Sequence, residues 1–494
     1  MKLFWLKICG LLPVFGLIIL FNQLALPYHM NDTEKYSYTV AGYLLAGKNV
    51  TNLWQPDDAA IVTRYIEGLN AKKEILVFGS SRSRLIRSDF FSSNSFFNNS
   101  ISGGGLRDYI ALYDLYAQKG LLPSTVILEI SPWVFSTDYH SRWTSLNARS
   151  DEILNSSVGL LNLALPKPIT DQFSLGYFQI SFYKQLLDWT SPVPLAQSSA
   201  IFPWNEGRLV NGETLQADGS VVYFRDHFHY DENRKLITAA AVEYANRPAP
   251  IPPEISPEAQ KNFAWLIEKL KAAQTRVILY LPPYHPEAYR LLLQSPIYQS
   301  LAPMEEYVQR FAREQQVQVI GSYDPARIAM DQDSFFDGSH LTEEAIQKIF
   351  TAALPDELKN KAGEGPARIK FTYISNPNGV EISENRPFFW IGKDTTCLEV
   401  SSPAAGYGVL SFNGTAGPSF PATPVRRLLL TNQANRYQQE LSITQYPDIR
   451  LVFPVTAGFN FVCLKPLDTP MVLEANRPLL LGVRDPEINF SATP

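Results

Sequence analysis

The sequence is poor in cysteine and in charge, and each shortage excludes a class of protein. Only three of the 494 residues are cysteines (Cys9, Cys397 and Cys463), which is too few for a disulfide scaffold, and their spacing is not that of a zinc site. Charged residues make up 18% and the net charge is −5, so the basic surface of a nucleic-acid-binding protein is absent. We therefore expect no metal, no cofactor and no nucleic-acid partner.

Apolar residues, in contrast, are plentiful. They make up 45% of the chain, enough for an ordinary hydrophobic core. No run of like charges marks an acidic or basic tail. A chain of 494 residues with this composition predicts a globular protein of about two or three domains.

The N-terminus has one long uncharged stretch. Residues 8–30 contain no Asp, Glu, Lys or Arg, and residues 8–21 are strongly apolar. Because about 20 apolar residues span a bilayer and Lys2 and Lys7 precede the stretch, we predict a single-pass transmembrane anchor within residues 1–30, its N-terminus in the cytoplasm. A cleaved signal peptide is the alternative, although no good small-x-small cleavage site is present. Both alternatives predict that the rest of the chain is extracytoplasmic, and periplasmic in a host with two membranes.

The next part of the chain alternates strand and helix patterns. Residues 31–72 predict two helices, which form a stalk or pack against the following domain. In residues 73–362, apolar runs such as 75–78 and 126–130 are separated by helical patterns such as 106–117. This alternation predicts a parallel sheet with helices on both faces and an active site at the carboxyl ends of the strands. A polar stretch at about 140–255 interrupts it, as an insertion or lid.

The C-terminal part changes character after a glycine-rich linker at residues 363–366. Eight short apolar or alternating runs, separated by Gly, Pro and Asn, predict an all-β sandwich over residues 366–494. Cys397 and Cys463 both fall in predicted strands. A disulfide and two buried free thiols both fit this placement.

A serine-rich turn follows the first predicted strand of the α/β region, as Gly79-Ser80-Ser81. A serine on a tight turn between a strand and a helix exposes its hydroxyl. The free backbone N–H groups at the start of the helix favour a developing oxyanion. A serine-rich turn that only caps a helix would have the same sequence, so this segment alone does not distinguish a catalytic serine from a capping one.

Two more segments suit the same chemistry. The three glycines at residues 103–105 allow the backbone to approach a substrate and direct an N–H group at it, although a flexible loop has the same composition. Asp337 precedes His340 by three residues, in a turn just before a predicted helix. Such a carboxylate holds the imidazole in one tautomer and leaves its other nitrogen free to take a proton from a serine. A surface turn capped by the aspartate is the alternative.

Together the three segments resemble the SGNH (GDSL-like) hydrolase superfamily. The first sequence block of that family has its serine two residues after the glycine, which is Ser81 here, with Ser80 in place of an aspartate. The second block points to Gly103 as an oxyanion donor, and the fifth, Asp-x-x-His, matches Asp337 and His340. The resemblance implies a flavodoxin-like three-layer α/β fold and a triad of Ser81, His340 and Asp337.

The third block departs from the family pattern. Trp133 stands where the family usually has an asparagine that supplies a further oxyanion donor, so Ser131 and the Trp133 indole are the candidate replacements. The Gly-Ser-Ser start together with Ser-Pro-Trp is similar to the D-alanine transfer protein of teichoic acid systems, and more distantly to proteins that O-acetylate alginate. These resemblances imply a polysaccharide substrate, a multispanning membrane acyltransferase as partner, and a sandwich that binds carbohydrate.

Other side chains are weaker candidates. Arg82 lies beside the serine, where it either holds an anionic substrate group or is a solvated helix charge. Tyr284 and His285 follow a predicted strand, and they either line the substrate cleft or pack in a turn. The histidines within residues 226–229 are two apart with no third ligand, which argues against a metal site.

The sequence as a whole predicts an acyl-ester enzyme. Ser81 is the expected nucleophile, with Ser80 as the alternative, His340 the general base and Asp337 its orienting carboxylate. If water accepts the acyl group the protein is an esterase, and if a sugar hydroxyl accepts it the protein is an O-acyl (O-acetyl) transferase, which the resemblance favours. The alternative from another class is a non-catalytic glycan-binding or assembly component, which Trp133 supports.

Overall fold

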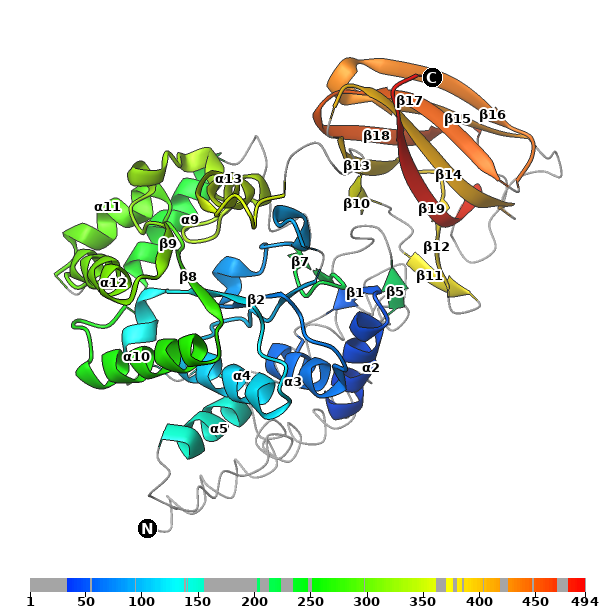
Figure 1. Cartoon of the computed structure of the whole chain (residues 1–494). Helices are drawn as coiled ribbons and strands as arrows, with labels where there is room; N and C mark the ends of the chain where they lie inside the picture. Colours follow the sequence, from blue (N-terminus) through cyan, green and yellow to red (C-terminus); the bar gives the residue numbers. More distant parts are fainter. Residues whose placement is uncertain are drawn as a thin grey trace, which may run out of the picture.

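The computed structural model describes residues 33–53, 56–93, 95–136, 139, 141–154, 202–204, 213–223, 234–247, 251–296, 298–360, 370–375, 380–383, 386–402, 404–417, 425–446, 448–468 and 479–493. These residues form one parallel sheet, three antiparallel sheets and the helices that pack on them (Figure 1).

The parallel sheet has five strands in the order β3-β2-β4-β8-β9. They are β2 (Ile75–Phe78), β3 (Phe96–Asn98), β4 (Thr125–Glu129), β8 (Arg276–Leu281) and β9 (Gln318–Gly321). Every residue of β2 and β4 is buried, as expected for apolar runs covered on both faces. The chain order reverses between β2 and β4, and such a switch point is where ligands bind in open α/β sheets.

Helices cover both faces of this sheet (Figure 1). On one face lie α3 (Asp58–Gly68), α4 (Leu106–Gln118) and α10 (Pro257–Ala272), and on the other α12 (Leu301–Gln315) and α13 (Glu343–Ala353). The remaining described helices are α2 (Thr33–Leu45), α5 (Thr144–Leu154), α9 (Arg234–Asn246) and α11 (Pro286–Gln294).

The α10 helix illustrates why the helices form where they do. The Ser256 side chain accepts the Ala259 N–H, and Pro257 occupies the first turn, where no intrahelical donor is needed. Phe263 and Leu270 lie on its buried face, at the spacing of an amphipathic helix. Apolar residues of α2 and α3 belong to the same core, so these two helices pack against the parallel-sheet region.

A small antiparallel sheet joins the N-terminal segment to the middle of the chain. Its order is β5-β1-β6-β7, from β1 (Asn49–Leu53), β5 (Phe202–Trp204), β6 (Glu213–Leu215) and β7 (Val221–Val222). The region interpreted as an insertion therefore pairs with a strand from the start of the described chain, a long-range pairing that the sequence pattern does not reveal.

The C-terminal part is two five-stranded antiparallel sheets that share one apolar core. One sheet has the order β10-β13-β18-β15-β16, from β10 (Lys370–Ser375), β13 (Thr396–Ser402), β18 (Gly458–Pro466), β15 (Arg426–Asn432) and β16 (Tyr437–Ile443). The other has the order β11-β12-β19-β14-β17, from β11 (Val380–Ser383), β12 (Arg386–Ile391), β19 (Leu481–Ser491), β14 (Gly406–Ala416) and β17 (Ile449–Val455).

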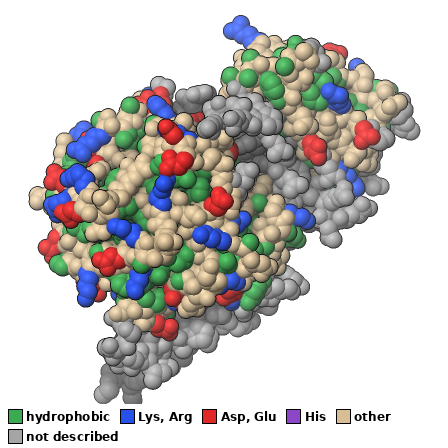
Figure 2. All heavy atoms as spheres, in the orientation of Figure 1, with side chains coloured by type: hydrophobic (Ala, Val, Ile, Leu, Met, Phe, Trp, Pro, Cys, Tyr) green, Lys and Arg blue, Asp and Glu red, His purple; other side chains and the backbone are tan. Residues whose placement is uncertain are grey.

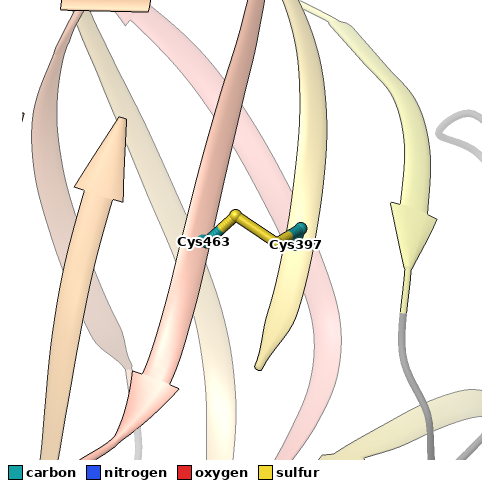
Figure 3. Close-up of a disulfide and its surroundings, with 2 residues drawn as sticks. All are labelled: Cys397 and Cys463. Atoms are coloured by element: carbon teal, nitrogen blue, oxygen red, sulfur yellow. A yellow bond between two sulfur atoms is a disulfide. The ribbon is translucent and has the colours of Figure 1, made fainter. Parts of the chain in front are cut away.

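A disulfide joins two adjacent strands of the first of these sheets. Cys397 on β13 lies directly opposite Cys463 on β18, and their sulfur atoms are bonded (Figure 3). Of the two arrangements open from the sequence, the structure has the disulfide. On the face shown in Figure 2, acidic and basic side chains are interspersed, without a patch of one sign.

The predicted fold class and localisation need correction. The structure combines one parallel sheet with three antiparallel ones, and no helix in the part of the chain that it describes is long and apolar enough to cross a membrane. The transmembrane anchor and the single-pass membrane localisation are therefore not carried further. Residues 1–30, on which the predicted anchor falls, lie outside the described residues, as do residues 226–229 and the linker at 363–366.

Candidate active site

The turn after β2 carries the two candidate serines. A Cβ on Gly79 would lie 1.9 Å from Ser83 Oγ, so glycine is required where the chain leaves the strand. Ser80 then caps the short 3-10 helix η1 (Ser81–Ser83), because its Oγ accepts the Arg82 N–H at 3.2 Å. Ser81, the first residue of η1, is half-buried.

Ser80 and Ser81 have different partners. Ser80 is fully buried, and both its hydroxyl and its N–H donate to the Glu129 carboxylate at 2.7 Å. Ser81 Oγ instead lies 2.8 Å from His340 Nε2. The structure therefore brings Ser81, and not Ser80, to the imidazole.

Glu129, at the end of β4, is a buried carboxylate beneath the serine turn. Besides the two groups of Ser80, it accepts the hydroxyl of Ser83 at 2.6 Å and the hydroxyl of Ser131. Both carboxylate oxygens are thus satisfied, as a buried charge requires. Glu129 therefore fixes the serine turn, which follows β2, to the end of the neighbouring strand β4. The switch point of the sheet lies between these two strands.

The histidine comes from the turn at residues 337–340, ahead of α13. Asp337 Oδ1 accepts the N–H groups of Ser339 at 2.7 Å and His340 at 2.8 Å, and Asp337 Oδ2 lies 2.7 Å from His340 Nδ1. When Nδ1–H donates to the carboxylate, Nε2 is the acceptor for the Ser81 hydroxyl. Phe336 stacks on the imidazole with ring centroids 5.4 Å apart.

The surroundings of Asp337 keep it ionised. Burial acts to raise its pKa, but the neighbouring His340 and the hydrogen bonds from His340 and Ser339 outweigh burial and lower the pKa to about 2. A carboxylate that is ionised at neutral pH stabilises the imidazolium that forms when the histidine takes a proton.

The glycine loop lies against the serine turn. Ile101 N–H donates to the Gly79 carbonyl at 3.0 Å, and a Cβ on Gly104 would lie 2.5 Å from that same oxygen. Gly103 has φ of +67°, in the left-handed region that favours glycine. The loop is therefore both close to the serine turn and dependent on its glycines.

One N–H group of this loop stands apart from its neighbours. In the described part of the chain, the Gly103 N–H has no acceptor, and Gly103 is half-buried. The other three N–H groups of residues 102–105 donate to Asp58 Oδ2 (from Ser102, 2.9 Å), Ile101 O (from Gly104, 2.9 Å) and Asp108 Oδ2 (from Gly105, 2.8 Å).

The two expected replacements for the missing asparagine are both occupied. Ser131 Oγ donates to Glu129, and Trp133 Nε1 donates to the Gly104 carbonyl at 2.8 Å. Both side chains are buried. The expectation that either donates to an oxyanion is corrected, because each instead holds a neighbouring loop in place.

Arg82 joins the serine turn to the histidine turn. Its side chain is 4% exposed. The guanidinium donates to the carbonyls of Pro282, Pro283 and Ser339 at 2.8, 2.7 and 3.1 Å, and it lies 4.1 Å from the centroid of the Tyr284 ring. The expected contact with an anionic substrate group is corrected, since this cation is buried, Nε and Nη2 donate to backbone carbonyls, and Nη1 lies 3.5 Å from Ser131 Oγ.

Tyr284 and His285 are buried, at 0% and 1% exposure. His285 Nδ1 accepts the Glu287 N–H at 3.1 Å and so caps α11, and burial lowers the pKa of this histidine. Neither side chain lines an open cleft. The expectation of a substrate contact is corrected in favour of the packed turn.

Several residues around the site carry no recognisable motif. Tyr223 donates to the Ser81 carbonyl at 3.4 Å, and Tyr139 and Trp143 donate to carbonyls of the glycine loop. Trp143 and Tyr223 come from the region interpreted as an insertion, and Tyr139 lies just before it. Glu129 is the exception among the residues around the site, because a charged residue within the apolar run 126–130 is unusual and could have been noticed in the sequence.

Three side chains at the edge of the parallel sheet form one hydrogen-bonded series. A hydroxyl, an imidazole and a carboxylate are hydrogen-bonded in that order beside the strand ends of a parallel sheet. Proteins activate a serine as a nucleophile with this arrangement, on several unrelated folds.

Comparisons with known proteins found only weak structural similarity to parts of the chain. No protein-family model and no curated protein matches it. Among solved structures it is similar to a candidate acylhydrolase from Bacteroides fragilis, with 12% identity and a TM-score of 0.26 over 58% of this chain and 89% of that one. A family 35 carbohydrate-binding module from an environmental isolate has 20% identity and a TM-score of 0.15, over 24% of this chain and 80% of that one.

A ruminal endo-β-1,4-mannanase has 10% identity and a TM-score of 0.16 over 22% of this chain, which spans 20% of the mannanase. TM-scores this low carry no argument about activity.

Proposed function

We propose that the chain is a serine acyl-ester enzyme in which Ser81, His340 and Asp337 form the catalytic triad. The observation that supports it is the continuous set of hydrogen bonds, 2.8 Å from Ser81 Oγ to Nε2 and 2.7 Å from Nδ1 to the Asp337 carboxylate. Ser81 Oγ attacks the acyl carbonyl carbon as its proton passes to His340 Nε2. The bond to the leaving alcohol then breaks, and the alcohol takes that proton from Nε2.

The second half of the reaction returns the acyl group to an acceptor. Water or a sugar hydroxyl gives its proton to Nε2 and attacks the acyl carbon; the ester to Ser81 then breaks as Nε2 returns that proton to Ser81 Oγ. The acceptor decides between esterase and O-acyl (O-acetyl) transferase. Backbone N–H groups of Ser81 and Gly103 stabilise the oxyanion in both halves.

The proposed substrate is an ester of a polysaccharide or related glycan. Its support is the similarity of the Gly-Ser-Ser and Ser-Pro-Trp segments to proteins that acylate cell-surface glycans. On the same basis we propose that the β10–β19 sandwich binds carbohydrate and that a multispanning membrane acyltransferase supplies the acyl group.

Hydrolysis of p-nitrophenyl acetate by the full chain tests the triad. Ser81→Ala should lower kcat/KM by about 10⁶-fold or to the background rate, as loss of a nucleophile does in other serine enzymes. Ser80→Ala is the matched control, and it should cost at most about tenfold, because Ser80 supports the turn through a hydrogen bond to Glu129. Equal rates for the wild type and Ser81→Ala would refute the proposal.

A non-catalytic glycan-binding component is the second candidate. Trp133 favours it. Trp133 stands where the family usually has an asparagine that donates to the oxyanion, and its indole N–H donates to the Gly104 carbonyl instead. The same assay separates the two candidates, since only an enzyme loses activity with Ser81. Mass spectrometry of defined oligosaccharides incubated with an acetyl donor then distinguishes transfer to sugar from release of acetate.

A further inference from the structure

The carbonyl oxygens of the glycine loop are held by three aromatic side chains in succession. Each donates one hydrogen bond to one carbonyl: Trp143 Nε1 to Ser102 O at 2.9 Å, Tyr139 Oη to Gly103 O at 2.7 Å, and Trp133 Nε1 to Gly104 O at 2.8 Å. Three successive peptide planes are therefore fixed on their carbonyl side by donors from outside the loop.

These three peptides differ on their N–H side. In a trans peptide the carbonyl of one residue and the N–H of the next point in opposite directions within one rigid plane. The planes held by Tyr139 and Trp133 contain the N–H groups of Gly104 and Gly105, which donate to Ile101 O and Asp108. Both of these planes are thus fixed from two sides.

The plane held by Trp143 contains the Gly103 N–H. The Gly103 N–H has no acceptor among the described residues. Within that part of the chain, the bond from Trp143 to the Ser102 carbonyl is therefore the only hydrogen bond to this peptide. Gly103 has φ of +67°, and a residue without Cβ rotates easily between conformations. This N–H is therefore the most dependent on its carbonyl-side partner.

We propose that Trp143 is a positioning residue for the oxyanion donor. Its indole N–H fixes the Ser102–Gly103 peptide and so holds the Gly103 N–H for the charge that develops on the acyl oxygen. This inference rests on the proposed function of Ser81. Trp143 is 4% exposed and carries the Arg142 guanidinium 4.3 Å from its ring centroid, so the indole is itself held from outside.

Two substitutions at Trp143 separate positioning from packing. Trp143→Phe keeps an aromatic ring and removes the donor. Trp143→His removes ring area, but its five-membered ring places Nε2–H as far from Cβ as the indole N–H. We expect Trp143→Phe to lower kcat for p-nitrophenyl acetate by roughly 10- to 100-fold, with KM changed less than about twofold, since donors to the oxyanion act in the transition state.

The order of the variants is the discriminating result. Trp143→His should have the lower Tm but the higher kcat. Trp133→Phe is the matched control, because it removes the same kind of bond from a plane whose N–H already has an acceptor; its kcat should fall less than that of Trp143→Phe. A kcat that follows Tm in both Trp143 variants, or equal losses in Trp133→Phe and Trp143→Phe, would overturn the inference.

Ser81→Ala is measured alongside these variants. If Ser81→Ala is inactive while Trp143→Phe keeps the wild-type kcat, the positioning role falls and the proposed function stands. If Ser81→Ala matches the wild type, both fall together.

Discussion

The serine turn and the histidine turn meet at two hydrogen bonds, from Ser81 Oγ to His340 Nε2 and from Arg82 Nε to the Ser339 carbonyl, yet they are held in different ways. In the serine turn, Ser80, Ser83 and Glu129 have no exposed surface, and their bonds join residues 46 to 49 positions apart in the chain. In the histidine turn, the His340 and Asp337 side chains are 23% and 35% exposed, and the bonds between these two residues span three positions.

This difference shows which part of the site depends on the whole fold. The histidine turn is a local structure, in which one carboxylate orders the next three residues. The serine turn depends on the end of the neighbouring strand, through Glu129, and on the histidine turn, through the bond of Arg82 to the Ser339 carbonyl. Substitutions in the histidine turn should therefore lower mainly activity, and substitutions that loosen the serine turn should lower stability as well.

Removing the carboxylate of the histidine turn should cost activity more than stability. In Asp337→Asn, an amide replaces the acceptor at His340 Nδ1, so the imidazole loses the tautomer that leaves Nε2 free. We expect kcat/KM to fall by about 10⁴-fold, and Tm to change little because the turn is half-exposed. Ester hydrolysis and thermal unfolding measure the two effects, and a large loss of Tm with modest loss of activity would reverse the comparison.

Removing the charge beneath the serine turn should cost both stability and activity. In Glu129→Gln, an amide cannot accept all four donors, and the buried Arg82 loses the nearby negative charge. We expect a loss of about 2–4 kcal/mol in unfolding free energy. Because a misplacement of about 1 Å costs roughly 10²-fold in rate, kcat should also fall by about 10- to 100-fold.

Glu305→Gln is the matched control for this change. Glu305 is also a buried carboxylate that accepts a serine hydroxyl, from Ser322 at 2.6 Å, and a backbone N–H, from Tyr323 at 3.1 Å. It should lower stability comparably and leave kcat nearly unchanged. Similar losses of kcat in Glu129→Gln and Glu305→Gln would show that the serine turn has no special dependence on its carboxylate.

The same contrast explains what the sequence predicts well and what it does not. The Asp337 and His340 spacing describes a local turn, and the apolar runs of β2, β4 and β8 describe strands, so both are readable from short windows. The roles of Arg82, Trp133 and Tyr284 depend on contacts between distant segments, which spacing does not encode. Their residue types fit a binding cleft as well as a packed interior, and only burial decides between the two.

Glu129 and Trp143 differ in how far their roles can be predicted from the sequence. A charge within the apolar strand β4 is an anomaly that a sequence can flag, although not the serines it binds. Trp143 lies in a region without regular periodicity and reaches the glycine loop 41 positions earlier in the chain. No local pattern marks such a contact.

The smallest expected effect concerns pH. The pKa of Asp337 is lowered from an ordinary 3.8 to about 2 in the folded protein, chiefly by His340 against the opposing effect of burial. A group whose pKa is lower in the folded state contributes stability above its unfolded pKa and loses it as pH falls. The contribution of Asp337 should therefore be complete above about pH 4 and disappear as pH falls towards 2.

Urea unfolding of the wild type and Asp337→Asn at pH 5, 4 and 3 measures this contribution. The difference between the two midpoints should be largest at pH 5 and shrink at pH 3, because Asp337 of the unfolded wild-type chain, with a pKa near 3.8, then takes up a proton that the folded carboxylate and the amide do not bind. Since the carboxylate is 35% exposed, solvent screening should keep the change small. A midpoint difference that stays constant over this range would mean that the pKa of Asp337 is the same in the folded and the unfolded chain.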